Sequence, residues 1–161
     1  MKLLRRPWLH ALGGLVLGAL FLYASYDKIL HPADFARIVY HYQLIGPSQW
    51  IGPWAANLLA VTLPWIEVVL GLSLITGVWR RESAAVAGAL LIVFVVAVSA
   101  ALLRGIDLEN CGCFSVSGEG RAAGIKLILG DLAMLAGTAV LAFVRPEAGS
   151  RALAAASDAA A

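Results

Sequence analysis

The sequence is poor in charged residues and almost free of sulfur. Lysine, arginine, aspartate and glutamate make up 14% of its 161 residues, against about 25% in soluble domains, and 61% of the residues are hydrophobic. So few charges argue against a soluble domain and predict an integral membrane protein. The formal net charge is only +2, and no long basic run is present, so the sequence gives no indication of nucleic-acid binding.

Four apolar segments approach the length of about 20 residues that a helix needs to cross a bilayer. They cover residues 8–26, 55–78, 84–103 and 125–144. Backbone polar groups inside a bilayer must be paired within the protein, so we expect an all-α fold in which these helices form a four-helix transmembrane bundle. We predict one membrane domain over residues 1–145 and an alanine-rich cytoplasmic tail over 146–161.

The first apolar segment follows Lys2, Arg5 and Arg6, a pattern that also describes a secretory signal peptide. The segment ends in Tyr-Ala-Ser-Tyr-Asp-Lys, which is a poor cleavage site for a signal peptidase. We therefore favour a retained helix.

The segment 28–54 is too polar to span a bilayer and too aromatic for a simple linker. Its apolar side chains fall near helical spacing, and Pro32 followed by Asp34 resembles a helix start. We predict a short amphipathic helix on the outer surface between the first two spans, with Trp50 and Trp54 as interfacial anchors. The apolar face of this helix would contain Ala33, Phe35, Ile38, Val39 and Tyr42.

Basic residues predict the orientation. The N-terminal tail, the loop after the second span and the C-terminal flank hold seven of the twelve lysines and arginines. Cytoplasmic loops carry the excess of such residues, so both termini are expected in the cytoplasm. The segment between the third and fourth spans would then face the periplasm of a bacterial inner membrane.

That outer segment contains the only two cysteines, Cys111 and Cys113, separated by Gly112. Their α-carbons are roughly 5.5–7 Å apart, which overlaps the range of about 4.4–6.8 Å that a disulfide tolerates. A disulfide between them would close a very small ring and so would add little stability to the fold. Strained, exposed disulfides are the ones that exchange readily. We interpret the pair as redox-active and keep a structural disulfide and metal binding as alternatives. A metal site would need further ligands, for which His31 and His41 are the candidates.

Exchange requires a thiolate, and a nearby cation lowers the pKa of a thiol. Lys28 and Arg104 are the best candidates for this role, because the helices that contain them should end beside the cysteines.

Two acidic residues fall inside predicted spans. Glu67 would lie roughly 18 Å from the outer end of the second span, near the bilayer midplane, where a charge costs about 2.5–3.5 kcal/mol or more. Pro64, one turn earlier, removes a backbone donor and predicts a local bend. Asp131 on the fourth span could face the same interior. We expect each acid either to carry protons or to link helices.

Several of these residues also resemble a known family, the MauE/DoxX group of redox-associated membrane proteins. The Cys-Gly-Cys-Phe motif that ends at Phe114 is the mark of its MauE branch, although relatives often have glycine at the position of Ser115. The remaining resemblance lies in segments 27–32, 42–44, 63–67 and 104–107 and at Phe35, Gly71 and Gly77. It implies a four-helix membrane protein. Members of the MauE branch are associated with methylamine utilisation, where they are thought to help oxidise or isomerise disulfides of a periplasmic dehydrogenase subunit beside a thioredoxin-like partner.

The leading hypothesis is a membrane thiol–disulfide oxidoreductase or redox relay. Cys111 and Cys113 would exchange a disulfide with a periplasmic thioredoxin-fold protein or a disulfide-containing client. If electrons continue into the membrane, a quinone is the natural acceptor, with Glu67 and Asp131 as proton carriers. The alternatives are a non-enzymatic assembly factor for a periplasmic redox protein and a metal-handling membrane protein.

Overall fold

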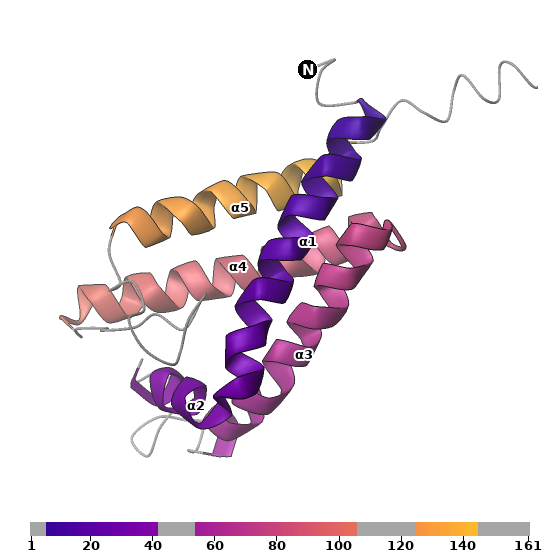
Figure 1. Ribbon diagram of the computed structural model, residues 1–161. Helices are drawn as coiled ribbons and strands as arrows, with labels where there is room; N and C mark the ends of the chain where they lie inside the picture. The colour runs from indigo at the N-terminus through magenta and orange to yellow at the C-terminus, as the bar shows by residue number, and fades with distance from the viewer. Residues whose placement is uncertain (1–5, 42–53, 106–124, 145–161) are drawn as a thin grey trace, which may run out of the picture.

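The computed structural model describes residues 6–41, 54–105 and 125–144 of the chain. These residues form five α-helices, shown in Figure 1: α1 (Pro7–Leu30), α2 (Pro32–His41), α3 (Trp54–Thr76), α4 (Arg80–Leu103) and α5 (Ile125–Phe143). The predicted all-helical class is therefore confirmed.

Three of the helices, α1, α3 and α4, are long and apolar enough to cross a membrane. The apolar part of α5 is shorter and covers Ile128–Phe143. The structure thus supports a membrane protein with three helices of spanning length and one shorter apolar helix.

The helices differ from the predicted spans mainly at their ends. Helix α1 continues to Leu30, four residues beyond the predicted end, and so includes Lys28. Helix α3 ends at Thr76 because Gly77 adopts a positive φ of 81°, and α4 begins at Arg80 after Trp79, whose φ is 49°. A positive φ is incompatible with continuing a right-handed helix, so these residues form a tight turn.

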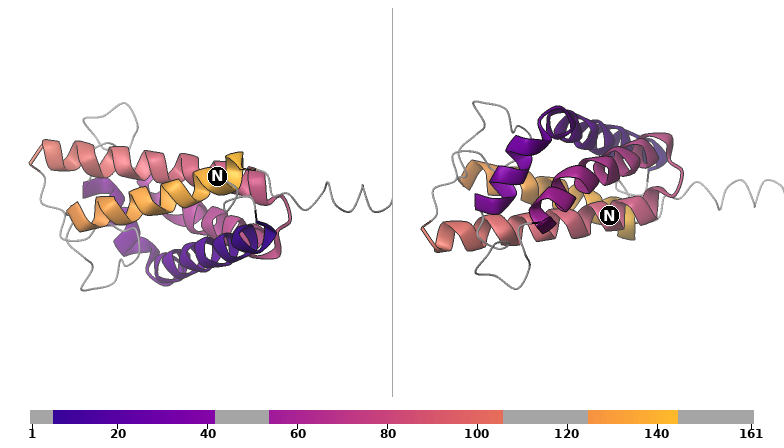
Figure 2. Two further views of the ribbon diagram at one scale, coloured as in Figure 1. Left: turned by 90° about the horizontal axis from the view of Figure 1, so that it is seen from above. Right: turned by 90° about the horizontal axis from the view of Figure 1, so that it is seen from below.

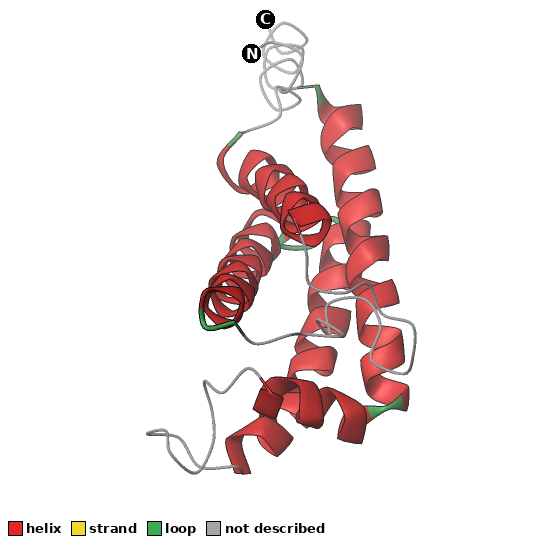
Figure 3. Ribbon diagram, turned by 90° about the vertical axis from the view of Figure 1, so that its left-hand side faces the viewer, coloured by secondary structure: helices red, strands yellow, loops and turns green. Residues whose placement is uncertain are grey.

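Helices α1, α3, α4 and α5 each have 19 residues or more, and we call them the four long helices. They are arranged as two antiparallel pairs. Helices α1 and α3 lie side by side, as do α4 and α5, and the two pairs cross one another (Figures 1 and 2). We call the side where α3 ends and α4 begins the Arg80 end. Helix α2 lies at the opposite side, across the far ends of α1 and α3 (Figure 3), which we call the α2 end.

Glycines allow α1 and α3 to approach closely. A Cβ atom placed on Gly18 would lie 2.5 Å from the carbonyl oxygen of Gly71, and one placed on Gly71 would lie 2.9 Å from the carbonyl oxygen of Gly18. A Cβ on Gly14 would lie 2.6 Å from the carbonyl oxygen of Leu74. Only glycine fits at such backbone contacts, which are typical of packed membrane helices.

All four long helices contribute to one buried apolar cluster. Its members are Leu17, Phe21, Leu70, Leu74, Ala84, Ala87, Leu91, Leu141 and Ala142. Large apolar side chains such as Val69, Val93 and Leu129 point outward on the same helices. Apolar residues on both faces are expected of helices surrounded by lipid.

The predicted amphipathic helix is present as α2. Phe35 is its most buried side chain, 1% exposed, and packs in a cluster with Ala60 of α3 and Phe94 of α4. Ala33, which we expected on the buried face, is exposed because it lies two residues before Phe35, about 200° around the helix. Tyr42 and Trp50 lie outside the described residues, and Trp54 is the exposed first residue of α3.

Candidate functional site

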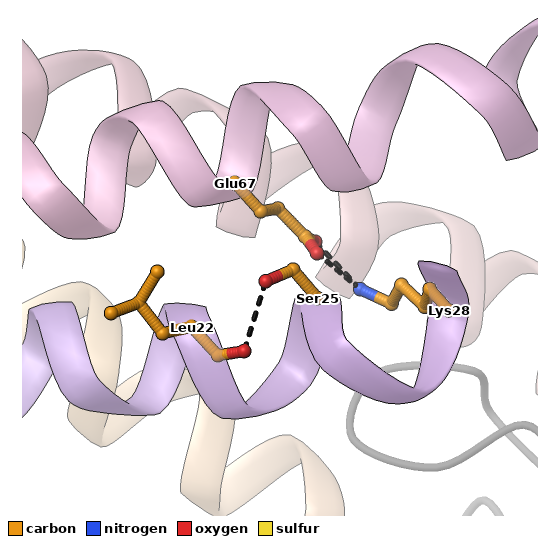
Figure 4. Close-up of polar contacts among 4 residues, drawn as sticks. All are labelled: Leu22, Ser25, Lys28 and Glu67. Carbon is orange, nitrogen blue, oxygen red and sulfur yellow. Dashed lines mark hydrogen bonds and ion pairs between the residues drawn. The ribbon is translucent and has the colours of Figure 1, made fainter. Parts of the chain in front are cut away.

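A buried ion pair joins α1 to α3. The Nζ atom of Lys28 lies 2.6 Å from Oε1 and 2.8 Å from Oε2 of Glu67, so the ammonium donates to both carboxylate oxygens (Figure 4). Lys28 is 1% exposed and Glu67 is 4% exposed. Charge-assisted hydrogen bonds of this length are the strong ones, and here they hold together two helices that are distant in sequence.

Two aromatic rings flank the same ammonium. Its nitrogen lies 5.3 Å from the ring centroid of Phe35 and 5.4 Å from that of Phe94. Both distances are within the range of a cation–π interaction. Lys28 on α1 is therefore contacted from α2, α3 and α4, and α2 helps to shield the ion pair with an apolar ring.

Two further features of α1 and α3 lie within one turn of the ion pair. The hydroxyl of Ser25, one turn before Lys28, donates to the carbonyl oxygen of Leu22 at 2.9 Å (Figure 4). Helix α3 continues through Pro64, which is buried one turn before Glu67. Proline has no N–H, so the carbonyl of Ala60 lacks its usual helical donor.

Asp131 on α5 is buried close to the ion pair. It is 2% exposed, and its Oδ2 atom has no hydrogen-bond partner among the described residues. Asp131 interacts electrostatically with Lys28, and both line one pocket with Glu67. Unpaired buried oxygens are rare in folded proteins, which makes Asp131 the feature of this site that most needs an explanation.

The pocket lies where the four long helices meet. It is lined by Phe21, Ala24, Lys28, Glu67, Leu90, Leu91, Phe94, Asp131 and Met134. We call these residues the charged pocket. Its volume of about 30 Å³ is enough for a water molecule.

A quinone ring does not fit the charged pocket, since sites for small organic ligands usually measure about 300–1,000 Å³. A larger cavity of about 360 Å³ lies between α1 and α5, but its lining is almost entirely apolar, and it is on the Arg80 side. The quinone expected from the sequence stays a prediction.

The four residues of the cysteine motif, Cys111, Gly112, Cys113 and Phe114, lie outside the described residues. The chain leaves the described part just after α4, where the backbone N–H of Arg104 donates to the carbonyl oxygens of Ala100 and Ala101. Its side chain is exposed. The proposed action of Arg104 and Lys28 on a thiolate stays a prediction.

The two histidines considered as metal ligands are both exposed. Nε2 of His31 lies 3.9 Å from Oδ1 of Asp27, and His41 is the last residue of α2. Within the described ranges, no group of three or more potential metal-binding side chains comes together.

The sequence predicted separate roles for Lys28 and Glu67, and their pairing was not predicted. Phe94, the second ring beside the ammonium, was not predicted either. Two signals were available: an acid inside a membrane needs a cationic partner, and Phe94 is the one aromatic residue within a long aliphatic run.

A comparison with protein families matches residues 6–144 to the model described as "Methylamine utilisation protein MauE". The chain belongs to the MauE family. The matched range contains all five helices and every residue of the charged pocket.

Two curated relatives support this assignment. Methylamine utilization protein MauE of Paracoccus denitrificans is 28% identical over 132 residues, which are 82% of this chain and 67% of the relative. Its counterpart in Methylorubrum extorquens is 30% identical over 143 residues, 84% of this chain and 74% of the relative. No solved structure matches the chain.

Proposed function

We propose that this MauE-family protein is a four-span inner-membrane protein that exchanges disulfides with a periplasmic redox protein through Cys111 and Cys113. The observation that carries the proposal is the Cys-Gly-Cys motif within a chain that matches the MauE family over nearly all of its length. The name of the two relatives links them to methylamine utilisation, and a role in the maturation of a periplasmic redox system fits that link.

The fourth span in this proposal is α5. Its 19 residues extend about 28 Å, close to the hydrocarbon thickness of about 30 Å. Four spans place both termini on one side, which the arginines at the Arg80 end favour as the cytoplasm. The segment between α4 and α5, which contains both cysteines, then faces the periplasm together with α2.

The proposed reaction is a balanced exchange. A thiolate of the partner attacks one sulfur of the Cys111–Cys113 disulfide and forms a mixed disulfide, and the other cysteine leaves as a thiolate. The partner's second thiolate then attacks the mixed disulfide and releases both cysteines in reduced form. Two electrons pass from the partner dithiol to the pair, and the reverse sequence oxidises the pair. The partner class is a thioredoxin-fold protein or a disulfide-containing client.

The test is the redox state of the two cysteines in intact cells. Cells are quenched in acid, and thiols that react with a maleimide are counted before and after reduction. We expect two thiols that appear only after reduction. Cys111→Ser and Cys113→Ser should each trap a partner as a mixed disulfide, whereas Ser115→Ala, the matched control in the same motif, should trap none.

The same experiment separates the proposal from its main alternative. A non-enzymatic assembly factor would show no mixed disulfide in either single variant, and the double variant Cys111→Ser/Cys113→Ser would still support maturation of its partner. Thiols that are free in the cell, without an adduct, would contradict an oxidising relay. Zinc or copper retained after dialysis of the reduced protein, and lost from the double variant, would favour metal handling.

A further inference from the structure

The charged pocket holds two acids and one base. Lys28 supplies one ammonium from α1, Glu67 one carboxylate from α3, and Asp131 one carboxylate from α5. Its remaining lining residues carry no charge: Phe21, Ala24, Leu90, Leu91, Phe94 and Met134. If all three groups were ionised, the pocket would carry one net negative charge in an apolar interior, where an uncompensated charge is costly.

The hydrogen bonds show which of the two acids has no cationic partner of its own. Lys28 donates to both oxygens of Glu67, so the ion pair is complete without Asp131. The Oδ2 atom of Asp131 is buried and has no partner among the described residues. Helix α4 contributes only Leu90, Leu91 and Phe94 to this lining, and α5 adds only Met134 beside Asp131.

We propose that the charged pocket is a one-proton site in which Asp131 is the residue that binds and releases the proton. The Lys28–Glu67 pair stays ionised, and the proton on Asp131 makes the pocket neutral. Release transfers the proton from the Asp131 carboxyl group to a water molecule in the pocket, which has room for one.

The size and donor set of the pocket favour a proton over a metal cation. A hard metal cation needs several oxygen ligands, about six to eight for Ca²⁺. Here both oxygens of Glu67 are engaged by Lys28, which leaves Asp131 as the one carboxylate that could bind a cation. A proton needs only one oxygen.

The proposal makes a countable prediction. The number of buried carboxylic acids should equal the number of carboxyl groups minus the number of ammonium groups in the pocket. The wild-type protein should have one. Lys28→Met should have two, because both acids lose their cation. Asp131→Asn should have none, and Glu67→Gln should also have none, because Lys28 is then free to pair with Asp131.

Infrared spectroscopy of the full chain in lipid nanodiscs at neutral pH tests this count through the carbonyl stretch of protonated carboxyl groups. We expect one such band in the wild type, shifted in heavy water and shifted again when aspartate is labelled with carbon-13 at its carboxyl group. The label assigns the band to aspartate in the wild-type protein, so the test holds even if a variant fails to fold. Asp34 on α2 is a partly exposed acid outside the pocket, so Asp34→Asn is the matched control and should keep the band.

Three results would overturn the proposal. These are the absence of the band, a band that does not shift with the aspartate label, and a band that disappears when the potassium in the buffer is replaced by sodium. The last result would indicate a sodium site. The test does not depend on the proposed disulfide exchange. Cys111→Ser/Cys113→Ser should keep the band, so failure of either proposal can be recognised separately.

Discussion

The two ends of this membrane domain are built in opposite ways. Toward the Arg80 end, α1 and α3 touch through their backbones at Gly18 and Gly71, and the guanidinium groups of Arg80 and Arg81 donate to carbonyl oxygens at the ends of α3 and α5. Toward the α2 end, the helices line the charged pocket, in which the Oδ2 atom of Asp131 has no hydrogen-bond partner among the described residues.

This difference places the contacts that stabilise the fold at one end and the buried ionisable groups at the other. Close backbone contacts between helices in lipid stabilise the fold through van der Waals packing. Buried ionisable groups in a membrane are costly, so they persist where a function or a helix-bridging role requires them. The Arg80 end is therefore held mainly by close packing, whereas the α2 end contains the buried ionisable groups Lys28, Glu67 and Asp131.

The largest effect is expected from breaking the ion pair. Lys28→Met removes the cation and leaves Glu67 buried without it, which should lower the free energy of unfolding by about 3 kcal/mol. Lys28→Met/Glu67→Leu should recover part of this loss, since replacing both members of a buried pair with apolar residues is often close to neutral. Unfolding by a denaturing detergent in mixed micelles measures each value.

The matched control for this prediction is the exposed ion pair on α2. The Nη1 atom of Arg37 lies 3.5 Å from the Oδ1 atom of Asp34, and both side chains are solvent-accessible. Arg37→Gln should change stability by less than about 1 kcal/mol, because surface pairs contribute little. If Lys28→Met were as mild as Arg37→Gln, the buried pair would not be what holds α1 to α3 at this end.

A smaller effect is expected from filling the helix contact near the Arg80 end. Gly18→Ala places a methyl group against the carbonyl oxygen of Gly71, which forces α1 and α3 apart and should cost about 1–3 kcal/mol. Gly130→Ala is the control, because a Cβ there meets nothing within 4 Å. It should be neutral or slightly stabilising, as alanine favours a helix more than glycine does. Equal stability of the two variants would contradict the close approach.

The sequence predicted the helices well because their signals are local. Hydrophobic length located the four long helices to within a few residues, and helical spacing identified α2 with Phe35 on its buried face. The turn at Gly77 was missed as the end of α3, since Val78 and Trp79 are apolar and extend the hydrophobic run. The positive φ angles of Gly77 and Trp79 end the helix despite this composition.

The ion pair could not be predicted in the same way because it depends on helix rotation and side-chain length. Depth along the spans placed Lys28 near the outer surface and Glu67 near the midplane, which argues against contact. In the structure, α1 continues past Lys28 and Lys28 points toward the helix interior. The long side chain of Lys28 therefore reaches Glu67. From the sequence, Asp131 could face the interior, but the pocket that it shares with this pair depends on how α5 packs against the other helices.

The smallest effect is expected at the end of α5. The Nε–H group of Arg81 donates to the carbonyl oxygen of Ala142 at 2.8 Å. This carbonyl lies in the last turn of α5, where carbonyl oxygens have no backbone N–H partner within the helix. Arg81→Gln should therefore cost about 1 kcal/mol and speed hydrogen exchange of the amides in that turn. Arg81→Lys keeps the charge, so it controls for any effect on membrane orientation. If Arg81→Gln instead altered exchange around Asp131 and left the end of α5 unchanged, the two ends of the domain would be coupled, and the separation of packing from chemistry would be wrong.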